Sequence, residues 1–350
     1  MAPPRKHEIL LDHEEWEKQV FKNKHDCINQ WLKSKDSTGG ASRRTLNSYS
    51  RTASKFFHEH FPDTHPSEVT VGDIEEYVLD LNDRGVAQNT KRRYVESLSA
   101  FYTWALFRPR FEDITGNPAR VVLEEIPKEK KPRPETATWE NGREIIRNIP
   151  DPRDKTAAIL MAKTGARIRE VLTLKEEDLL LEDGFVRFTN RKGGTTTVNP
   201  VDQETILALN RLKALSSNDS PYMFVSIRGD RIKRERVRRV VRRAAVKAGV
   251  MDKVDEQDWH KKFTPHYYRT IFTSLMRNNG MPDHYTRYLR GDGDKEVMDL
   301  YTKIPRDEVR DEYLEIIKPL NLYTRTDGGG ENQRLESTKS TSSETVQTRL

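Results

Sequence analysis

A proline-rich, basic segment divides this chain and limits how it can fold. Residues 126–136 contain three prolines and four basic residues, and Ile126 is their only large apolar side chain. Proline supplies no backbone N–H for a helix or a sheet, and cations are costly to bury, so the segment suits an extended, basic linker. We therefore expect two folded domains, one on each side of it.

Most of the apolar residues outside this linker recur at helical spacing. Residues 184–200 are the exception, because apolar and polar residues alternate there around a glycine turn, as in a β-hairpin. We predict a mainly α fold with a small β-sheet in the second domain. The expected organisation is an N-terminal helical extension at 1–40, a helical domain at 41–125, a second domain with the small sheet at 137–323 and a disordered tail at 324–350.

Several helix boundaries can be predicted in the first domain. Residues 13–33 are expected to form one helix. Thr70-Val71-Gly72-Asp73 reads as a capping box before an apolar stripe, and Gly85 is the expected end of that helix. Asn89 or Thr90 is the expected cap of the next helix.

The positive charge of the chain is unevenly distributed. The net charge is +6, and residues 228–247 carry ten cations against two acids. Such a basic stripe favours a footprint on the DNA backbone over a merely solvated surface. A second cluster lies in the first turn of a predicted helix, where cations are unfavourable, so an external anion or a solvated face would explain it. The candidate DNA-binding residues are Lys91, Arg92, Arg93, Lys130, Lys131, Arg234, Arg238, Arg239 and Arg242.

Other features of the sequence exclude some classes of protein. No run of 18 apolar residues is present, so we expect no membrane span. The segment Met1–His7 lacks the apolar stretch of a secretory signal, and Cys27 is the single cysteine, so no internal disulfide can form. We expect a cytoplasmic, nucleoid-associated protein, located in the host cell if its source is viral.

One stretch combines an imidazole and a guanidinium at the start of a predicted helix. Thr264-Pro265-His266-Tyr267-Tyr268-Arg269 carries the signals of a helix N-terminus, and Gly280 is the expected end. His266 and Arg269 then share one face near the positive pole, where backbone N–H groups favour an anion such as a phosphate. The pair also occurs by chance, as a satisfied histidine beside a solvated arginine.

Two further cations follow turns. Thr164-Gly165 ends one predicted helix and Arg167 begins the next, a position that is mildly unfavourable for a cation and therefore needs an explanation. The other reading of Arg167 is an ordinary surface residue. Lys192 lies at the tip of the predicted hairpin, where most lysines only keep the sheet edge soluble.

Read together, these segments resemble the tyrosine recombinase, or phage integrase, family. The resemblance covers residues 42–317, and 42–118 looks like the family's helical core-binding domain. It implies that the domain at 41–125 binds DNA and that the domain at 137–323 is catalytic. Four motifs in order carry it: Thr164–Leu172 as the first arginine motif, Lys192 as the hairpin lysine, Thr264–Arg269 as the His-x-x-Arg box, and Leu289-Arg290-Gly291 followed by Tyr301 as the nucleophile segment.

This resemblance implies a site-specific DNA recombinase or integrase that cuts and rejoins strands through a covalent 3′-phosphotyrosine. It implies double-stranded DNA as partner, a homotetramer on two recombination sites, and no need for a metal or another cofactor. The implied roles are a phosphate clamp for Arg167 and Arg269, a proton donor to the leaving 5′-oxygen for Lys192, a general base or phosphate donor for His266, and the nucleophile for Tyr301.

One position departs from the family pattern. Asp292 stands where the family usually has His or Trp next to the scissile phosphate. A carboxylate would repel a phosphate unless it were protonated or turned away, so we carry no role over to Asp292. The departure suits an archaeal or archaeal-virus source.

Other assignments remain open at this stage. The rivals of Tyr301 for the nucleophile are Tyr267, Tyr268, Tyr285 and Tyr288. A type IB topoisomerase-like enzyme would use the same chemistry without joining two sites. A DNA-binding regulator on the same fold would have lost catalysis, with Asp292 as a sign of that loss.

Overall fold

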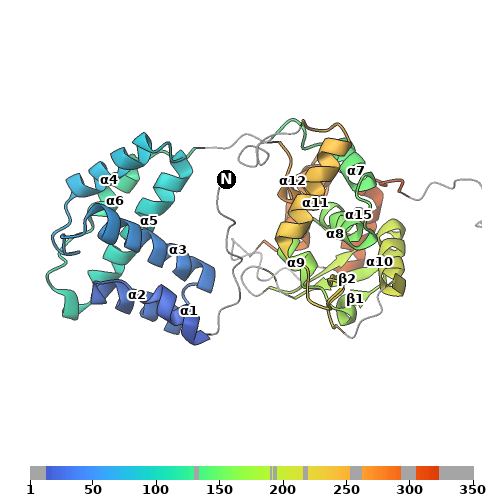
Figure 1. Cartoon of the computed structure of the whole chain (residues 1–350). Helices are drawn as coiled ribbons and strands as arrows, with labels where there is room; N and C mark the ends of the chain where they lie inside the picture. The colour runs from blue at the N-terminus through green and yellow to red at the C-terminus, as the bar shows by residue number, and fades with distance from the viewer. Residues whose placement is uncertain are drawn as a thin grey trace, which may run out of the picture. The chain divides into compact units, whose positions relative to one another are not determined.

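The chain forms two sets of packed helices, the second with a small sheet (Figure 1), and each set has its own hydrophobic core. The computed structural model describes residues 13–129, 134–189, 191, 195–215, 220–252, 262–292 and 305–322. The chain divides into a unit up to Pro132 and a unit from Arg133 onward. The predicted fold class is confirmed, because both units are mainly helical and a small sheet lies in the second. The narrower domain boundaries that we drew from the sequence remain predictions.

The first unit is built around one long helix, α5. This helix packs against α2, α3, α4 and α6, and aromatic side chains such as Trp31 and Phe101 fill the space between them. Side chains of α1 and α2 belong to the same core as those of the later helices. The elements are α1 (His13–Val20), α2 (Asp26–Ser37), α3 (Arg43–Ser54), the π-helical turn η1 (Lys55–His60), α4 (Val71–Asp83), α5 (Gln88–Ala105), the 3₁₀ turn η2 (Pro109–Phe111) and α6 (Pro118–Glu125).

The predicted capping box at the start of α4 is confirmed. The backbone N–H of Thr70 donates to Oδ2 of Asp73 at 2.7 Å, and Oγ1 of Thr70 accepts from the N–H of Asp73 at 3.2 Å. At the other end Gly85 has a φ of +67°, which glycine adopts without strain. Local sequence signals therefore set both ends of this helix.

Two predictions in the first unit are wrong for identifiable reasons. Residues 13–33 form two helices, because the side chain of Asn23 accepts the backbone N–H of His25 at 3.0 Å and stabilises a turn between them. Helix α5 begins at Gln88 with Ala87 as its N-cap. Asn89 does not cap it, since its side chain instead forms two hydrogen bonds with the backbone of Glu129.

Helix α8 occupies the interior of the second unit (Figure 1). It packs against α7, α9, α10, α11 and α12, and its residues from Thr156 to Thr164 are all buried. The elements of this unit are α7 (Trp139–Arg147), α8 (Pro152–Thr164), α9 (Ile168–Leu172), the 3₁₀ turn η3 (Glu176–Asp178), β1 (Leu179–Leu180), β2 (Phe185–Phe188), β3 (Thr197–Pro200), α10 (Gln203–Leu215), α11 (Arg234–Lys247), α12 (Pro265–Asn278), α13 (Asp283–Arg290) and α15 (Arg306–Ile316).

The predicted hairpin is present within a three-stranded antiparallel sheet of order β1-β2-β3. Phe185 pairs with Pro200 and Phe188 pairs with Thr197, so the second strand of the hairpin begins at Thr197. Strand β1 was not predicted.

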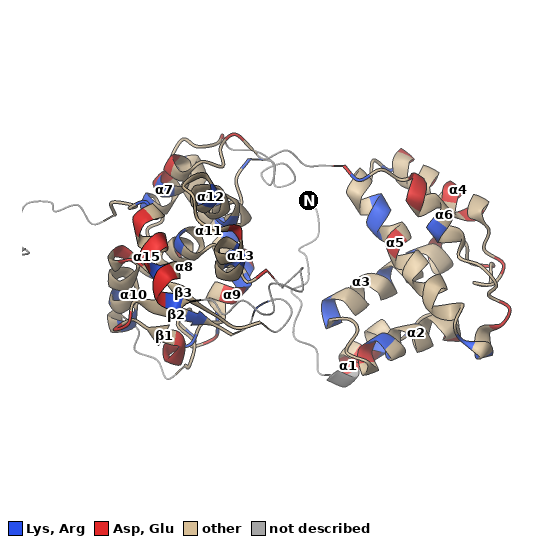
Figure 2. Cartoon of the chain, turned by 180° about the vertical axis from the view of Figure 1, so that it is seen from behind, with Lys and Arg blue, Asp and Glu red and all other residues tan. Residues whose placement is uncertain are grey.

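The acidic helix α15 (Figure 2) packs against β3 and α12 and buries Val309 and Tyr313. None of the helices in the described part of the chain has both the length and the apolar character that crossing a lipid bilayer requires.

Candidate active site

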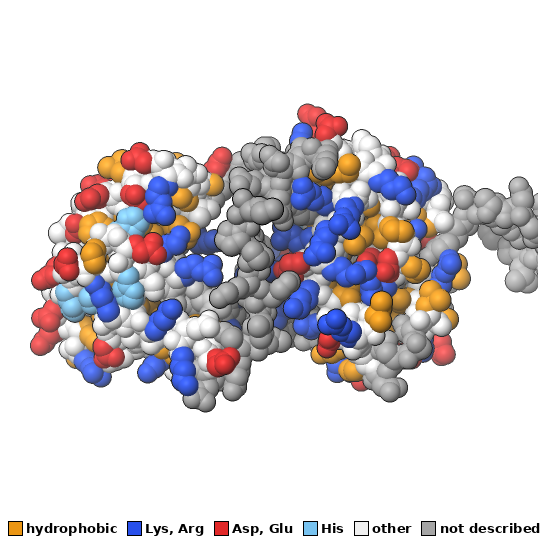
Figure 3. Space-filling model, viewed as in Figure 1, with side chains coloured by type: hydrophobic (Ala, Val, Ile, Leu, Met, Phe, Trp, Pro, Cys, Tyr) orange, Lys and Arg blue, Asp and Glu red, His pale blue; other side chains and the backbone are white. Residues whose placement is uncertain are grey.

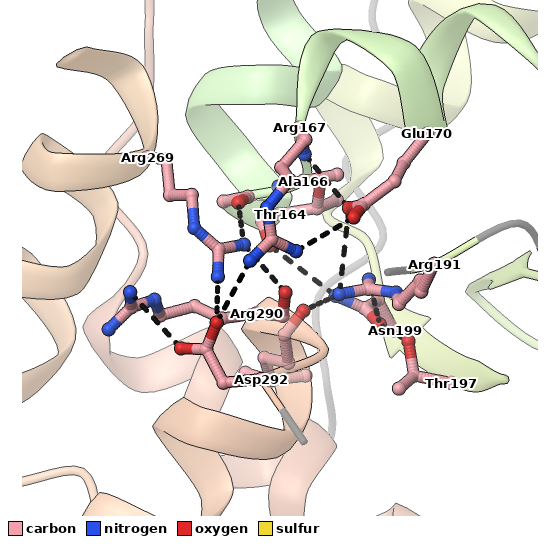
Figure 4. A network of polar contacts seen from close by, with 12 residues as sticks. Thr164, Ala166, Arg167, Glu170, Arg191, Thr197, Asn199, Arg269, Arg290 and Asp292 are labelled. Carbon is pink, nitrogen blue, oxygen red and sulfur yellow. Dashed lines mark hydrogen bonds and ion pairs between the residues drawn. The ribbon is translucent and has the colours of Figure 1, made fainter. Parts of the chain in front are cut away.

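A sharp turn after α8 presents Arg167 (Figure 4). Gly165 has a φ of +64°, and a Cβ added there would overlap the ring of Phe272 on α12, so only glycine fits this turn without rearrangement. Arg167 follows as the N-cap residue of α9, where its backbone N–H donates to Oε2 of Glu170 at 2.9 Å. Oε1 of Glu170 accepts a 2.8 Å hydrogen bond from Nη1 of Arg167. One carboxylate therefore holds both the backbone and the guanidinium of Arg167.

Arg269 reaches the same place from α12. Its side chain is 4% exposed, and its Nη1 donates to the carbonyl oxygens of Gly165 at 2.9 Å and Arg290 at 2.6 Å. These bonds join the end of α8 to the end of α13. Burial, and after it the charge of Arg167, lower the pKa of Arg269 to about 10, so the guanidinium remains protonated at neutral pH.

A single carboxylate oxygen lies between the two arginines. Oδ1 of Asp292 accepts from Nη2 of Arg167 at 3.2 Å and from Nη2 of Arg269 (Figure 4). The other oxygen, Oδ2, lies 3.1 Å from Nη2 of Arg290. We call the position of Oδ1, shared by the Nη2 atoms of Arg167 and Arg269, the anion seat. Guanidinium groups arranged in this way suit a carboxylate or a phosphate oxygen equally well.

The end of α13 determines where Asp292 lies. Gly291 has a φ of +60°, its N–H donates to the carbonyl of Tyr288 at 2.8 Å, and the N–H of Asp292 donates to that of Arg287 at 3.1 Å. This pair of bonds is the Schellman motif that ends many helices at a glycine. From the sequence we considered a protonated or outward-turned Asp292. The structure instead directs the carboxylate into the arginines.

Two buried charged residues behind the anion seat were missed from the sequence. Glu170 contacts Arg191, whose Nη1 lies 3.8 Å from Oε2, and both side chains are at most 3% exposed. Nη2 of Arg191 donates to Oδ1 of Asn199 at 3.2 Å, and burial lowers the pKa of Arg191 to about 10. Glu170 could have been found, because it follows Arg167 at the spacing of a capping box. Arg191 carried no such signal, since a cation beside a strand usually indicates solvent.

His266 is the second residue of α12. Thr264 is the N-cap as predicted, although its side chain accepts no capping hydrogen bond. Partial burial lowers the pKa of His266, and the charges of three arginines act in the same direction: Arg269, Arg167 and Arg290. The residue as a whole is exposed. A neutral imidazole at the surface of the site can accept a proton or a hydrogen bond.

Family comparisons take in both units. The model of the "Phage integrase family" matches residues 140–306, a range that includes Arg167, His266 and Arg269. The model of the "Phage integrase, N-terminal SAM-like domain" matches residues 28–110. This chain belongs to the phage integrase family, the tyrosine recombinases. The resemblance inferred from four short motifs is thereby confirmed.

Relatives of this recombinase are similar over most of their length. Tyrosine recombinase XerA of Pyrococcus furiosus is 25% identical over 295 residues, which cover 83% of this chain and 92% of the relative. Tyrosine recombinase XerC of Thermodesulfovibrio yellowstonii is 27% identical over 279 residues, with 76% and 87% covered. A lambda integrase dimer bound to a COC′ core site has the same fold, with a TM-score of 0.62 at 19% identity over 83% of this chain and 77% of that chain.

Two of the predicted catalytic residues of the recombinase, Lys192 and Tyr301, lie outside the described residues, and their roles stay predictions. The structure brings together the other three, Arg167, His266 and Arg269, on neighbouring helix starts. The family resemblance led us to expect this convergence, and no local pattern in the sequence indicates it, because α9 and α12 are about a hundred residues apart.

Three rivals of Tyr301 have hydroxyl groups that are already engaged. Tyr268 is fully buried and its hydroxyl donates to the carbonyl of Gly142 at 3.3 Å. The hydroxyl of Tyr285 donates to Oε2 of Glu308 at 3.1 Å. The hydroxyl of Tyr288 accepts from the backbone N–H of Val198 at 3.0 Å. Each of these three hydroxyl groups is bound by another residue of the second unit. Tyr267, the fourth rival, is half-buried on α12.

The candidate DNA-binding residues differ in their exposure to solvent. Arg238 and Arg239 on α11 are exposed, and Figure 3 shows Lys and Arg side chains gathered on the face of the second unit where α11 lies. Val237 and Val241 form the opposite, buried face of this helix. The remaining candidates on α11 are Arg234, which contacts Glu235 at 2.6 Å, and the half-buried Arg242.

In the first unit two of the three candidate cations have partners within the unit. Nη1 of Arg92 donates to the carbonyl oxygens of Leu123, at 2.8 Å, and Ile126. Lys91 contacts the side-chain oxygen of Asn82. These bonds offer a second explanation for a basic first helical turn, beside the external anion. Arg93 is exposed, while Lys130 and Lys131 lie outside the described residues.

Proposed function

We propose that this tyrosine recombinase cuts and rejoins DNA strands at specific sites through a covalent 3′-phosphotyrosine at Tyr301. The anion seat is the observation that carries the proposal. Two guanidinium groups from helices far apart in sequence, Arg167 and Arg269, share one anionic oxygen there. Hydrogen bonds to phosphate oxygens strengthen as charge accumulates in the transition state, so this geometry suits phosphoryl transfer.

In the proposed reaction the phenolic oxygen of Tyr301 attacks the scissile phosphorus. The bond from phosphorus to the 5′-oxygen breaks, and Lys192 gives that oxygen its proton. Arg167 and Arg269 hold the non-bridging oxygens while charge accumulates on them. His266 takes the phenolic proton or donates a hydrogen bond to the phosphate. Attack by the 5′-hydroxyl of another strand on the phosphotyrosine then reverses these steps, so the energy of the phosphodiester is conserved.

A nicked suicide substrate tests the nucleophile. Loss of a short fragment after cleavage removes the 5′-hydroxyl that would reverse the reaction, so the covalent adduct accumulates. We expect no adduct with Tyr301→Phe and a normal yield with Tyr288→Phe, whose hydroxyl binds Val198. An adduct that persists in the Tyr301 variant would move the assignment to another tyrosine.

The products separate recombination from its alternatives. A recombinase joins two sites, whereas a type IB topoisomerase-like enzyme relaxes supercoiled circles without joining them. A DNA-binding regulator without catalysis would give no covalent adduct with any variant. The carboxylate in the anion seat favours none of these alternatives by itself, because an exchangeable anion is compatible with an active phosphate clamp.

We further propose that the working form is a homotetramer on two DNA sites. One solved structure with the same fold is a lambda integrase tetramer bound to a Holliday junction, with a TM-score of 0.62 at 18% identity. Sedimentation of the protein with two-site DNA should give a particle with four protomers. We retain a nucleoid-associated location as a prediction that follows from action on DNA.

A further inference from the structure

The anion seat is filled by a residue of the protein itself. Asp292 places one carboxylate oxygen on the Nη2 atoms of Arg167 and Arg269, the atoms to which the proposed function assigns a non-bridging phosphate oxygen. Two oxygen atoms cannot occupy one position. The scissile phosphate therefore has to displace Asp292 before these arginines can act on it.

We propose that Asp292 is an internal mimic of the scissile phosphate that restricts the anion seat to duplex DNA. This inference rests on the proposed function of Arg167 and Arg269. A small free anion gains only the contacts of the seat and competes poorly with a tethered carboxylate. A DNA duplex gains many further contacts along its backbone, and these supply the free energy to displace Asp292.

The replacement of Asp292 by a phosphate leaves the charge in the anion seat unchanged. In the described residues of the network, four guanidinium groups face two carboxylates, those of Glu170 and Asp292 (Figure 4). A phosphodiester carries one negative charge, as the carboxylate of Asp292 does. Its entry exchanges one anion for another and leaves no additional guanidinium unneutralised. The half-buried seat would otherwise hold cations that repel one another.

The structure also offers the displaced carboxylate a place. Arg290 already lies 3.1 Å from Oδ2 of Asp292, and its Nε is buried without a hydrogen bond to any described residue. A rotation of the Asp292 side chain about its own bonds would move its carboxylate from Arg167 and Arg269 to the guanidinium of Arg290. The backbone of Asp292 would not need to move, since the Schellman bonds of α13 hold it.

Binding of inorganic phosphate to the full-length protein, measured by calorimetry, tests the inference. Asp292→Asn keeps the shape of the side chain and removes its charge, so the seat is vacated and its affinity for phosphate should rise at least ~10-fold. Asp292→Glu should behave like the wild type. The matched control is Asp283→Asn, at the first residue of the same helix, where an exposed carboxylate pairs with Arg277 at 2.6 Å.

The outcomes separate this inference from the proposed function. If Arg167→Ala and Arg269→Ala abolish cleavage but Asp292→Asn binds phosphate no better than the wild type, the internal mimic is refuted and the clamp stands. If the arginine variants cleave DNA normally, the proposed function fails first. If Asp292→Asn does not fold, a structure of the wild type in a covalent complex with a suicide substrate tests the inference instead. A carboxylate of Asp292 that still lies between the two arginines refutes the inference, and one that has moved to Arg290 supports it.

Discussion

The guanidinium of Arg269 donates a 2.9 Å hydrogen bond to the carbonyl oxygen of Gly165, a residue 104 positions earlier in the chain. That carbonyl belongs to the turn from which Arg167 projects. The position of one arginine of the anion seat is therefore coupled to the backbone that carries the other. The seat exists only when α8, α12 and α13 are packed together, and its chemistry depends on the stability of that packing.

Gly165→Ala should destabilise the second unit and reduce cleavage. The new Cβ would overlap Phe272 at a φ of +64°, and strain plus overlap together cost roughly 2–4 kcal/mol. Gly249→Ala is the matched control, since its φ is +68° and nothing lies within 4 Å of the added Cβ, so only the strain of about 1–2 kcal/mol applies. Urea unfolding measures both. Equal losses in the two variants would contradict the close approach of Phe272.

Arg269→Lys should slow cleavage while leaving DNA binding nearly unchanged. Lysine keeps the charge but cannot donate to Gly165, Arg290 and the anion seat at once, and the loss of one such donor costs on the order of 10²–10³ in rate. Adduct formation on a suicide substrate measures the rate. Arg277→Lys on the exposed side of the same helix should cleave at the wild-type rate. A near-normal rate for Arg269→Lys would mean that position 269 supplies only charge.

Glu170→Gln should lower both stability and cleavage. The carboxylate is 3% exposed and faces Arg167 and Arg191, so its neutralisation leaves the buried Arg191 without a carboxylate partner, at a cost of roughly 1–3 kcal/mol. Thermal and urea unfolding measure the loss of stability, and DNA binding should change little. Glu177→Gln, at an exposed carboxylate paired with Lys175, is the control. Unchanged unfolding in Glu170→Gln would show that Arg167 is held without this charge.

Cleavage should weaken as the pH falls, through the protonation of His266. Its pKa is lowered from 6.5 by burial and by neighbouring arginines, so the neutral form that accepts a proton persists below pH 6.5 and disappears at lower pH. Folding stability changes in the same direction, because below pH 6.5 the unfolded chain binds the proton more readily than the folded one. A pH profile of the single-turnover rate measures the first effect. His266→Asn should flatten that profile, and His284→Asn should not.

Arg239→Ala should weaken DNA binding by a salt-dependent amount. The side chain is exposed on the basic face of α11, and each phosphate contact contributes a slope of about −0.9 to log K against log salt, so its loss should flatten the slope by about one unit. Fluorescence anisotropy between low and moderate salt measures the slope. Lys213→Ala on α10, where the lysine contacts Glu176, should leave it unchanged. A uniform loss of affinity at every salt concentration would argue against a phosphate contact.

Features that depend on nearby residues could be predicted from the sequence. Helix α8 ends at Thr164 as expected, because Gly165 supplies the left-handed end. The capping box of α4 and the start of α12 were predicted for similar reasons. These signals act over a few residues, which is why they survive in any tertiary context. Strand β1 could not be predicted, because its two residues are too few to show a periodicity.

Only the tertiary structure determined the chemistry of the site. By itself the sequence specified two units, the helical periodicity of each and the presence of Arg167, His266 and Arg269. It did not specify that Arg191 would be buried behind Glu170, or that Asp292 would point into the arginines rather than away from them. Those outcomes arise from the packing of helices that are distant in sequence. A buried charge is stable only beside a partner, and the fold can supply that partner from a distant part of the chain, so no local sequence pattern identifies it.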